Sequence, residues 1–192
     1  NTDRNGKIGI KFNRIINWIS NVNNKVFRTI LQILIGIDKR VVLPRYNTET
    51  FDKYSKKNID KINTSAPAFG RKAVIYSTCF VNFNKKKTGI AALKVLKKNG
   101  VEVQNSYPGC CGMPNLEQAN PEKVVEQAIK VSNDLLKWVE KGYDVITLTA
   151  SCGLMLKFEW PLLLPNNSNI KKLSKHTKDI DEYLVDIHQK EG

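Results

Sequence analysis

The sequence predicts an α/β fold: a small, open, mainly parallel sheet with flanking helices in βαβ units, preceded by an N-terminal helical segment. From residue 73 onward, short apolar runs alternate with segments of helical periodicity, which is the pattern of parallel strands joined by right-handed crossovers. The chain has 192 residues, of which 41% are hydrophobic, so it can bury one core and carry an appendage. We therefore expect a helical linker or docking segment at 1–45, an extended linker at 46–72 and a domain at 73–192.

Three segments of this domain have the character of strands. Residues 73–78 form a short apolar run, residues 101–105 alternate between apolar and polar, and residues 144–149 contain Val, Ile and Leu among β-favouring threonines. Two longer segments, 88–99 and 121–141, repeat their apolar residues with the period of a helix and end at helix-terminating glycines. Further helices are expected at 152–160, 167–175 and 179–189.

Residues 8–37 are strongly apolar with basic interruptions, and their apolar residues recur at three- and four-residue steps. We expect two helices there, at 11–22 and at 25–36, the second ending near Gly36. Because the second helix is apolar on more than one face, it is interpreted as a core or docking helix, with a membrane-surface helix as the alternative. The chain has no run of eighteen apolar residues, so no transmembrane helix is expected.

The positive charge is concentrated in the first part of the chain. The whole sequence carries a net charge of +13, of which residues 1–78 contribute +10 through fifteen Lys and Arg against five Asp and Glu. Such a bias suits an anionic membrane surface or an acidic partner subunit, although scattered, solvated lysines are the favoured explanation. No nucleic-acid motif accompanies the charge, so we expect no nucleic-acid partner.

All four cysteines of the chain follow predicted strands: Cys79, the adjacent pair Cys110 and Cys111, and Cys152. In open parallel sheets, sites form in the crevice beyond the carboxyl ends of the strands, so the four thiols are expected to converge there. A disulfide between adjacent cysteines is badly strained, and four unevenly spaced cysteines do not resemble a secreted disulfide framework. The pattern favours soft-metal ligation or redox chemistry in a reducing cytoplasm.

These motifs resemble a known family. Three segments carry the resemblance in order and spacing: Cys79-Phe-Val-Asn82, Cys110-Cys-Gly-Met-Pro114 and Ser151-Cys-Gly-Leu-Met-Leu156. They are similar to the cysteine-rich "CCG" domain found in heterodisulfide reductase (in the subunit designated B), in anaerobic glycerol-3-phosphate dehydrogenase (in the subunit designated C) and in the glycolate oxidase iron–sulfur subunit. The glycerol-3-phosphate type is the most similar, over about residues 36–192, and the chain is expected to be an internal piece with the first CCG copy.

The resemblance implies a ligand set and a cofactor. The metal ligands would be Cys79, Cys110, Cys111 and Cys152, while the fifth cysteine position of the family is occupied here by Met155, which is expected to belong to the core. Four thiolates are enough for an iron–sulfur cluster, either [4Fe–4S] or a non-cubane variant, and zinc is the less favoured alternative. A degenerate copy without metal, or thiol–disulfide chemistry, remains open.

Two further residues are assigned to cofactor binding. Gly112 would allow positive φ and a close approach of the backbone to the site, whereas the simpler interpretation is a turn glycine. Asn82 would donate an amide hydrogen bond to a sulfur, whereas the simpler interpretation is loop capping. Ser151 could act in the same way beside its cysteine. His176 and His188 lie in lysine-rich helices and are expected to be solvated.

The predicted function is that of an electron-transfer iron–sulfur subunit of a flavin-linked respiratory dehydrogenase. The resemblance implies a flavoprotein partner that oxidises the substrate, with electrons passing towards quinone or another acceptor. The basic N-terminal helices would then dock on a membrane surface or a membrane-anchor subunit. We expect a cytoplasmic location, peripheral on the inner face of the cell membrane in that case. The alternative is a cluster-free scaffold module that mediates subunit interaction.

Overall fold

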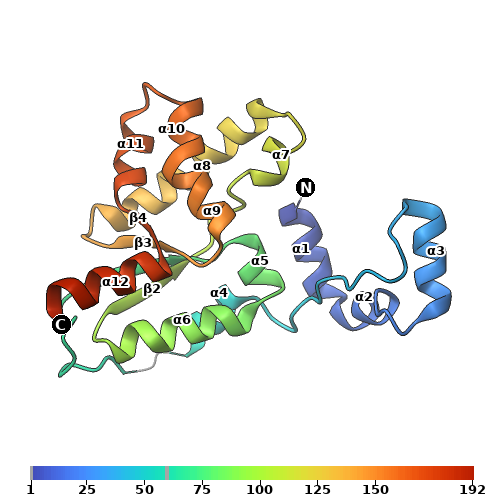
Figure 1. Ribbon diagram of the computed structural model, residues 1–192, viewed down its shortest axis with the longest axis horizontal. Coiled ribbons are helices and arrows are strands. Elements are labelled where there is room, and N and C mark those ends of the chain that lie inside the picture. The colour runs from blue at the N-terminus through green and yellow to red at the C-terminus, as the bar shows by residue number, and fades with distance from the viewer. Residues whose placement is uncertain (1, 59–60) are drawn as a thin grey trace.

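The computed structural model describes residues 2–58 and 61–192 and contains a four-stranded parallel sheet in the order β2–β1–β3–β4 (Figure 1). The strands are β1 (Lys72–Tyr76), β2 (Glu102–Ser106), β3 (Asp144–Thr147) and the short β4 (Thr177–Asp179), of which β4 was not expected from the sequence. The chain runs from β1 to β2 on one side and then crosses back to β3 on the other. The winding therefore reverses between β1 and β3, and the predicted α/β class is confirmed.

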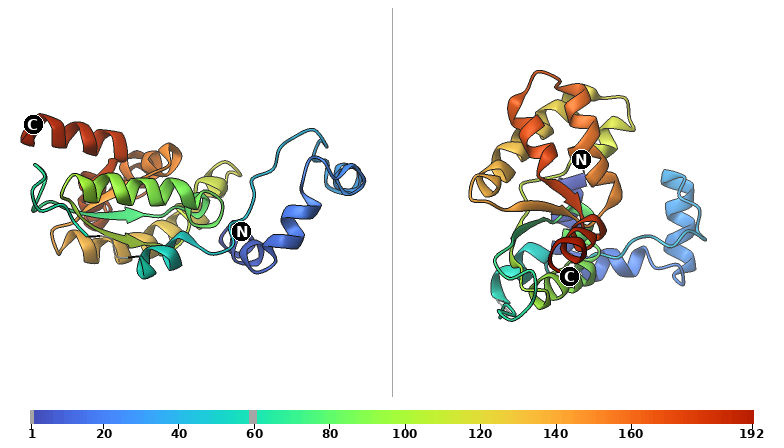
Figure 2. Two further views of the ribbon diagram at one scale, coloured as in Figure 1. Left: turned by 90° about the horizontal axis from the view of Figure 1, so that it is seen from below. Right: turned by 60° about the vertical axis from the view of Figure 1, so that its left-hand side comes forward.

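Helices cover both faces of this sheet (Figure 2). One face is covered by α6 (Lys86–Lys98) and α12 (Ile180–Glu191), and the other by α8 (Pro121–Val139) and α11 (Ser168–Lys175). All four lie within one or two residues of the helices predicted for these segments, because each carries an apolar face of helical period that can be buried against the sheet.

The central strand β1 divides the core into two layers. Its side chains alternate in direction, so Ala73 and Ile75 pack with residues of α6 and α12, whereas Val74 and Tyr76 pack with residues of α8 and α11. All four of these side chains are fully buried. Both faces of a parallel sheet must be covered in this way, which explains why the strand is a continuous apolar run in the sequence.

Several short helices stand at the carboxyl ends of the strands, and they position the site. They are α5 (Cys79–Phe83), α7 (Met113–Leu116), α9 (Ala150–Leu154), the π-helical turn η1 (Met155–Glu159) and α10 (Trp160–Leu163). The single helix expected at 152–160 is thus three short pieces, with the π-helical turn in the middle. The helices α5 and α7 are too short to give a periodic signal and were not predicted.

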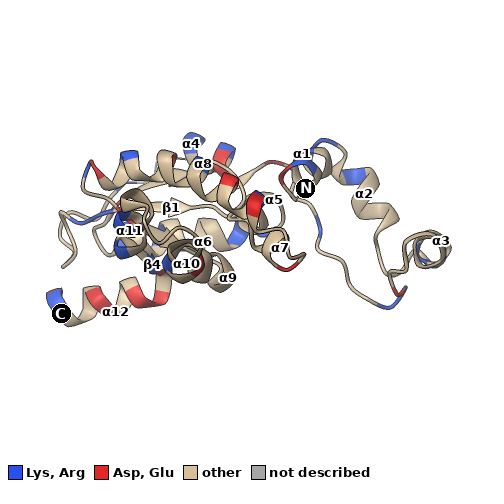
Figure 3. Ribbon diagram, turned by 90° about the horizontal axis from the view of Figure 1, so that it is seen from above, with Lys and Arg blue, Asp and Glu red and all other residues tan. Residues whose placement is uncertain are grey.

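The N-terminal segment differs from the prediction of a helix at 11–22. It forms α1 (Thr2–Lys11) and α2 (Asn13–Ile19), followed by α3 (Lys25–Ile35). Two glycines make α1 a poor helix by propensity, but both lie against aromatic rings, so tertiary contact overrides propensity. The helix α3 ends as predicted at Gly36, which has a φ of +71°. Figure 1 shows α1 beside α5, and α2 and α3 standing away from the sheet; Figure 3 shows Lys and Arg along α1 and α2.

The segment 46–72, expected to be extended, contains the helix α4 (Phe51–Lys57). Thr50 caps it by accepting a hydrogen bond from the backbone N–H of Lys53 at 3.1 Å. Phe51 is fully buried beneath α6, where it touches Gly89. A capping residue followed by one buried aromatic side chain fixes this helix to the domain, so the segment is partly folded rather than a free linker.

Candidate metal centre

The ends of three strands position the four cysteines. Cys79 is the first residue of α5, three positions after β1 ends, and Thr78 caps this helix by accepting a hydrogen bond from the backbone N–H of Val81 at 3.3 Å. Cys110 and Cys111 lie in the loop between β2 and α7, and Cys152 lies in α9, which follows β3. The predicted convergence beyond the carboxyl ends of β1, β2 and β3 is therefore present in the structure.

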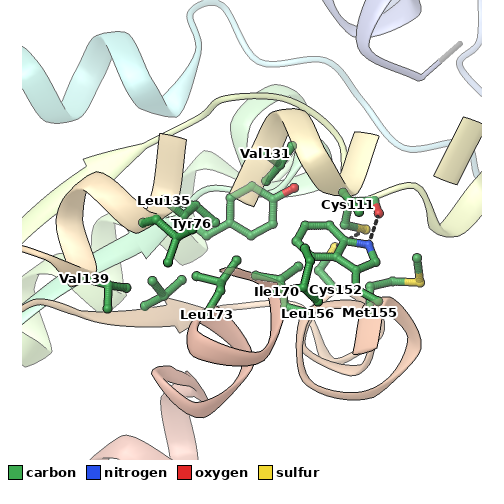
Figure 4. Packing of buried hydrophobic residues seen from close by; sticks show 14 of the residues in the cluster. Tyr76, Cys111, Val131, Leu135, Val139, Cys152, Met155, Leu156, Ile170 and Leu173 are labelled. Carbon is green, nitrogen blue, oxygen red and sulfur yellow. Dashed lines mark hydrogen bonds between the residues drawn. The ribbon is translucent and has the colours of Figure 1, made fainter. Parts of the chain in front are cut away.

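The four thiols form one continuous group. The Sγ atoms of Cys79 and Cys110 are 3.9 Å apart, and those of Cys111 and Cys152 are 3.2 Å apart. The side chains of Cys110 and Cys111 also interact with each other, which links the two pairs. All four are free thiols; Cys79 is partly exposed and the other three are buried (Figure 4 shows Cys111 and Cys152).

Protons are unevenly distributed within this group. Hydrogen bonds from the Cys111 and Cys79 thiols lower the pKa of Cys110 below the ordinary value of a thiol. The same contacts with Cys110, together with burial, raise the pKa of Cys79 and of Cys111. The arrangement favours one thiolate that accepts hydrogen bonds from its neighbours, and such a thiolate is a soft nucleophile or metal ligand.

Two buried aromatic residues hold the loop that carries the cysteine pair. Trp160 donates its indole N–H to the backbone carbonyl of Cys111 at 3.0 Å, and Tyr76 donates its hydroxyl to the carbonyl of Gly109 at 2.7 Å (Figure 4 labels Cys111 and Tyr76). Both side chains are fully buried. Sequence reasoning assigned neither residue to the site, because each looks like an ordinary core aromatic and only the fold shows where its polar atom points.

A second contact ties the loops after β1 and β3 together. The hydroxyl oxygens of Thr78 and Thr149 are 3.1 Å apart and share a hydrogen bond. Since Thr78 precedes Cys79 and Thr149 occupies the N-cap position of the helix of Cys152, this bond fixes the spacing of the two strand-end cysteines. Threonine at a strand end gives no distinct signal in the sequence.

Gly112 follows the cysteine pair with a φ of +96°, in the left-handed region that favours glycine. It precedes α7 at the N-cap position, and a Cβ atom placed there would lie 3.0 Å from Oε1 of Gln127 and 3.3 Å from Cγ1 of Val124. Gln127 itself accepts a hydrogen bond from the side chain of Asn115 at 2.7 Å. The loop can therefore lie directly on α8 only without a side chain at residue 112.

The other residues singled out from the sequence are Asn82, Met155 and Ser151, and each lies in a different environment. Asn82 is buried, but its side-chain oxygen accepts a hydrogen bond from the backbone N–H of Asp52 at 2.9 Å; no bond from its amide to a cysteine sulfur occurs in the described part of the chain. It thus joins α5 to α4. Met155 is fully buried in the same core cluster as Cys111 and Cys152, as expected for a core residue. Ser151 is exposed.

The donor set matches the chemistry of an iron–sulfur cluster, since four soft sulfur atoms lie together in a largely buried site. As they stand, the thiols are hydrogen-bonded to one another. Within residues 2–58 and 61–192, no three His, Cys, Asp or Glu side chains form a group around a single metal ion. Cluster binding would replace these S–H···S contacts by bonds to iron.

A parallel α/β sheet with thiols gathered beyond its strand ends defines a cysteine-rich domain. Residues 73–157 match the family described as the cysteine-rich domain, CCG. The resemblance expected from the motifs is thereby confirmed. No solved structure shows a significant similarity to the chain.

Three relatives illustrate the context of this domain. The chain is 29% identical to the subunit designated C of the anaerobic glycerol-3-phosphate dehydrogenase of Escherichia coli K12, over 95% of this chain and 45% of that protein. It is 28% identical to lactate utilization protein A of Macrococcus caseolyticus, over 60% and 47%. It is 29% identical to the subunit designated B of the fumarate reductase (CoM/CoB) of Methanothermobacter marburgensis, over 61% and 22%. The chain thus spans less than half of these relatives.

Proposed function

We propose that this protein is an electron-transfer subunit that holds an iron–sulfur cluster between Cys79, Cys110, Cys111 and Cys152. The observation that carries the proposal is the gathering of all four thiols beyond three different strand ends, although they span 74 residues in sequence. A cluster bound there would supply one-electron chemistry. Two of the relatives are named as a subunit of a dehydrogenase and a subunit of a reductase, which supports a role in redox catalysis.

The residues around the thiols suit this role. Trp160 and Tyr76 fix the backbone of the cysteine loop, so the two adjacent side chains are held towards one site rather than splayed apart. The core that surrounds Cys111 and Cys152 is apolar and excludes water. A buried, rigid site of this kind limits the reorganisation that accompanies a change of charge, and burial is one of the means by which a protein sets a cluster potential.

The partner in this proposal is a flavoprotein that oxidises a small substrate and passes electrons to this subunit, and through it to quinone or another acceptor. Because all four thiols would be ligands of the cluster, none would remain to bind an organic substrate. In this proposal the substrate therefore binds to the flavoprotein. The dehydrogenase and reductase names of the relatives support a multi-subunit assembly. The α2–α3 segment offers a surface for such docking.

For the α2–α3 segment we propose peripheral binding to an anionic membrane surface. Ile33 and Leu34 of α3 are 77% and 74% exposed, and Trp18 of α2 is 58% exposed. Lys25 is the first residue of α3, Lys39 and Arg40 follow this helix in the sequence, and residues 1–78 carry most of the net charge. No helix in the described residues is long and apolar enough to cross a membrane. An apolar surface bordered by cations is typical of interfacial helices.

Anaerobic reconstitution with iron and sulfide tests the central proposal. The wild-type chain should acquire iron and acid-labile sulfide together, with a visible absorption band and a signal in electron paramagnetic resonance after reduction. Cys111→Ser and Cys152→Ser should lose most of the iron. The matched control is Met155→Leu, a substitution of similar volume at a buried position, which should retain it.

The alternatives give distinct results in the same experiment. A folded wild-type chain that takes up neither iron nor sulfide would leave the cluster-free scaffold as the function. Stoichiometric zinc without sulfide would indicate a structural zinc site instead. Equal iron content in wild type, Cys111→Ser and Cys152→Ser would show that the iron is bound elsewhere.

A further inference from the structure

The first turn of α1 lies beside the mouth of the cysteine site. A cavity of about 440 Å³ is lined by Thr2 and Asp3 on one side and by Cys110 on another. A second cavity of about 330 Å³ is lined by Thr2, Asn5 and Gly6 together with Cys79. The same turn of helix therefore borders a cavity at Cys110 and a cavity at Cys79.

One long-range hydrogen bond fastens this turn to the domain. Tyr107, which follows β2, donates its hydroxyl to a carboxylate oxygen of Asp3 at 2.9 Å. The carboxylate also forms an ion pair with Lys7 at 2.8 Å, one turn further along α1. The ring of Tyr107 packs edge-on against Phe83 with a centroid distance of 5.4 Å, so the hydroxyl is held by a rigid aromatic pair.

Close backbone contact positions the rest of the helix. A Cβ atom at Gly6 would lie 2.1 Å from the ring of Phe83, and one at Gly9 would lie 2.2 Å from the ring of Tyr46. These glycines thus let α1 lie flush against α5, the helix that begins with Cys79, and against the segment before α4. Phe83 and Tyr107 of the cysteine-rich domain form part of the surface against which α1 packs. The glycines leave the contacting face of α1 without side chains at these two positions.

From these contacts we infer that α1 forms a wall of the cysteine site, and that Asp3 and Tyr107 are positioning residues which hold this wall closed over Cys79 and Cys110. The wall limits access of water, oxygen and other small reagents to the two thiols. This inference extends the proposed function, because it says how the site would be shielded, but it does not require a bound cluster.

The test is the rate at which iodoacetamide alkylates Cys79 in the metal-free, reduced protein, with the modified residue assigned by mass spectrometry. Tyr107→Phe removes the hydroxyl but keeps the ring contact with Phe83, and no formal charge changes. We expect alkylation of Cys79 to become about tenfold faster, since a hydrogen bond to a carboxylate is worth about 1.5 kcal/mol and 1.4 kcal/mol corresponds to a factor of about ten. Asp3→Asn should have a similar effect.

Hydrogen–deuterium exchange separates opening of the wall from electrostatics. If Tyr107→Phe opens the wall, the amides of α1 exchange faster while those of β1 and α8 do not change. The control Asp38→Asn removes a carboxylate from an ion pair with Arg40 outside the site, and it should alter neither measurement. A Cys79 rate that rises in Asp3→Asn but not in Tyr107→Phe, or unchanged exchange of α1, would overturn the inference.

The outcome is independent of the proposed function. Iron and sulfide uptake by the wild type is measured separately. A chain that binds no cluster can therefore still show a closed wall, and a chain that binds a cluster can show an open one. In the reconstituted protein, the same variants should lose their visible absorption faster in air. Faster bleaching without faster alkylation would indicate a weakened cluster rather than an opened wall.

Discussion

Trp160 donates its indole N–H to the backbone carbonyl of Cys111 at 3.0 Å, and its side chain is fully buried. Trp160 begins α10, directly after the π-helical turn that follows the helix of Cys152. A single side chain therefore ties the segment of one cysteine to the loop of another. The extra residue of the π-helical turn sets the direction in which Trp160 points, and such turns are frequent at functional sites.

Replacing this tryptophan should weaken both the fold and the site. In Trp160→Phe, the buried carbonyl of Cys111 loses its donor and part of the indole volume becomes a cavity. We expect the free energy of unfolding to fall by about 2–4 kcal/mol, measured by urea denaturation. Iron retention after reconstitution should fall as well, because the cysteine loop is no longer held.

The matched control is Trp138→Phe. Trp138 is only partly buried near the end of α8, where its ring packs edge-on against Tyr143. We expect a smaller loss of stability and unchanged iron retention. If the two variants proved indistinguishable in iron content, the hydrogen bond to Cys111 would have no part in shaping the site.

Gly112 and Gly142 allow backbone strain to be separated from crowding. Both have positive φ, +96° and +83°, but a Cβ atom at Gly112 meets Gln127 and Val124, whereas one at Gly142 meets nothing within 4 Å. Gly142→Ala should cost about 1–2 kcal/mol of stability from the left-handed conformation alone. Gly112→Ala should cost more by urea denaturation, and it alone should reduce iron uptake, because it displaces the adjacent cysteine pair.

Much of the fold could be predicted from the sequence, because the spacing of apolar residues indicates which face of a helix or strand is buried. The strands at 73–78, 101–105 and 144–149 and the helix at 121–141 were placed correctly to within a few residues. The helix predicted at 11–22 corresponds to the shorter α2, whereas α1 was not predicted, since this glycine-rich helix is stabilised by Phe83 and Tyr46 and not by its own propensity. The strand β4 has three residues, which is too short for any period to appear.

The candidate site was likewise predictable only in part. The convergence of the cysteines follows from the rule for strand ends, so the sequence was sufficient to predict it. The supports of the site were not predictable, because the role of Trp160 or Tyr107 depends on which backbone carbonyl or carboxylate lies opposite its polar atom. Asn82 is close to Cys79 in the sequence, but its side-chain oxygen accepts a hydrogen bond from the backbone N–H of Asp52, in the first turn of α4. Its sequence position therefore did not show which group it contacts.

Binding to anionic vesicles tests the role of α3. The double variant Ile33→Asn with Leu34→Asn removes apolar side chains that are 77% and 74% exposed, so the fold should tolerate it. We expect it to lose most sedimentation with vesicles of phosphatidylglycerol and phosphatidylcholine. Leu162→Asn is the control, because Leu162 is 73% exposed on α10. Wild-type protein that does not sediment at low salt, or equal sedimentation of all variants, would contradict membrane docking.

The ion pairs that attach α12 should make stability depend on acidity. Asp186 accepts hydrogen bonds from Lys190 and from Arg71, and these lower the pKa of its carboxyl group. Its native pKa thus lies below the unfolded value of about 3.9. The contribution is fully present above that value and is lost as pH falls through the native pKa, because protonation then favours the unfolded chain. Arg71 directly precedes β1, so the loss would loosen the contact between the sheet and α12.

Asp186→Asn should therefore lower the free energy of unfolding at neutral pH and flatten its decline below about pH 4. The measurement is urea denaturation at a series of pH values, with Asp134→Asn as the control. Asp134 forms an ion pair with Lys137 of similar length, 2.7 Å, but its side chain is 43% exposed against 20% for Asp186. Exposed pairs contribute little, so the control should follow the wild-type curve. An acid decline that is equally steep in Asp186→Asn would assign the pH dependence to other carboxylates.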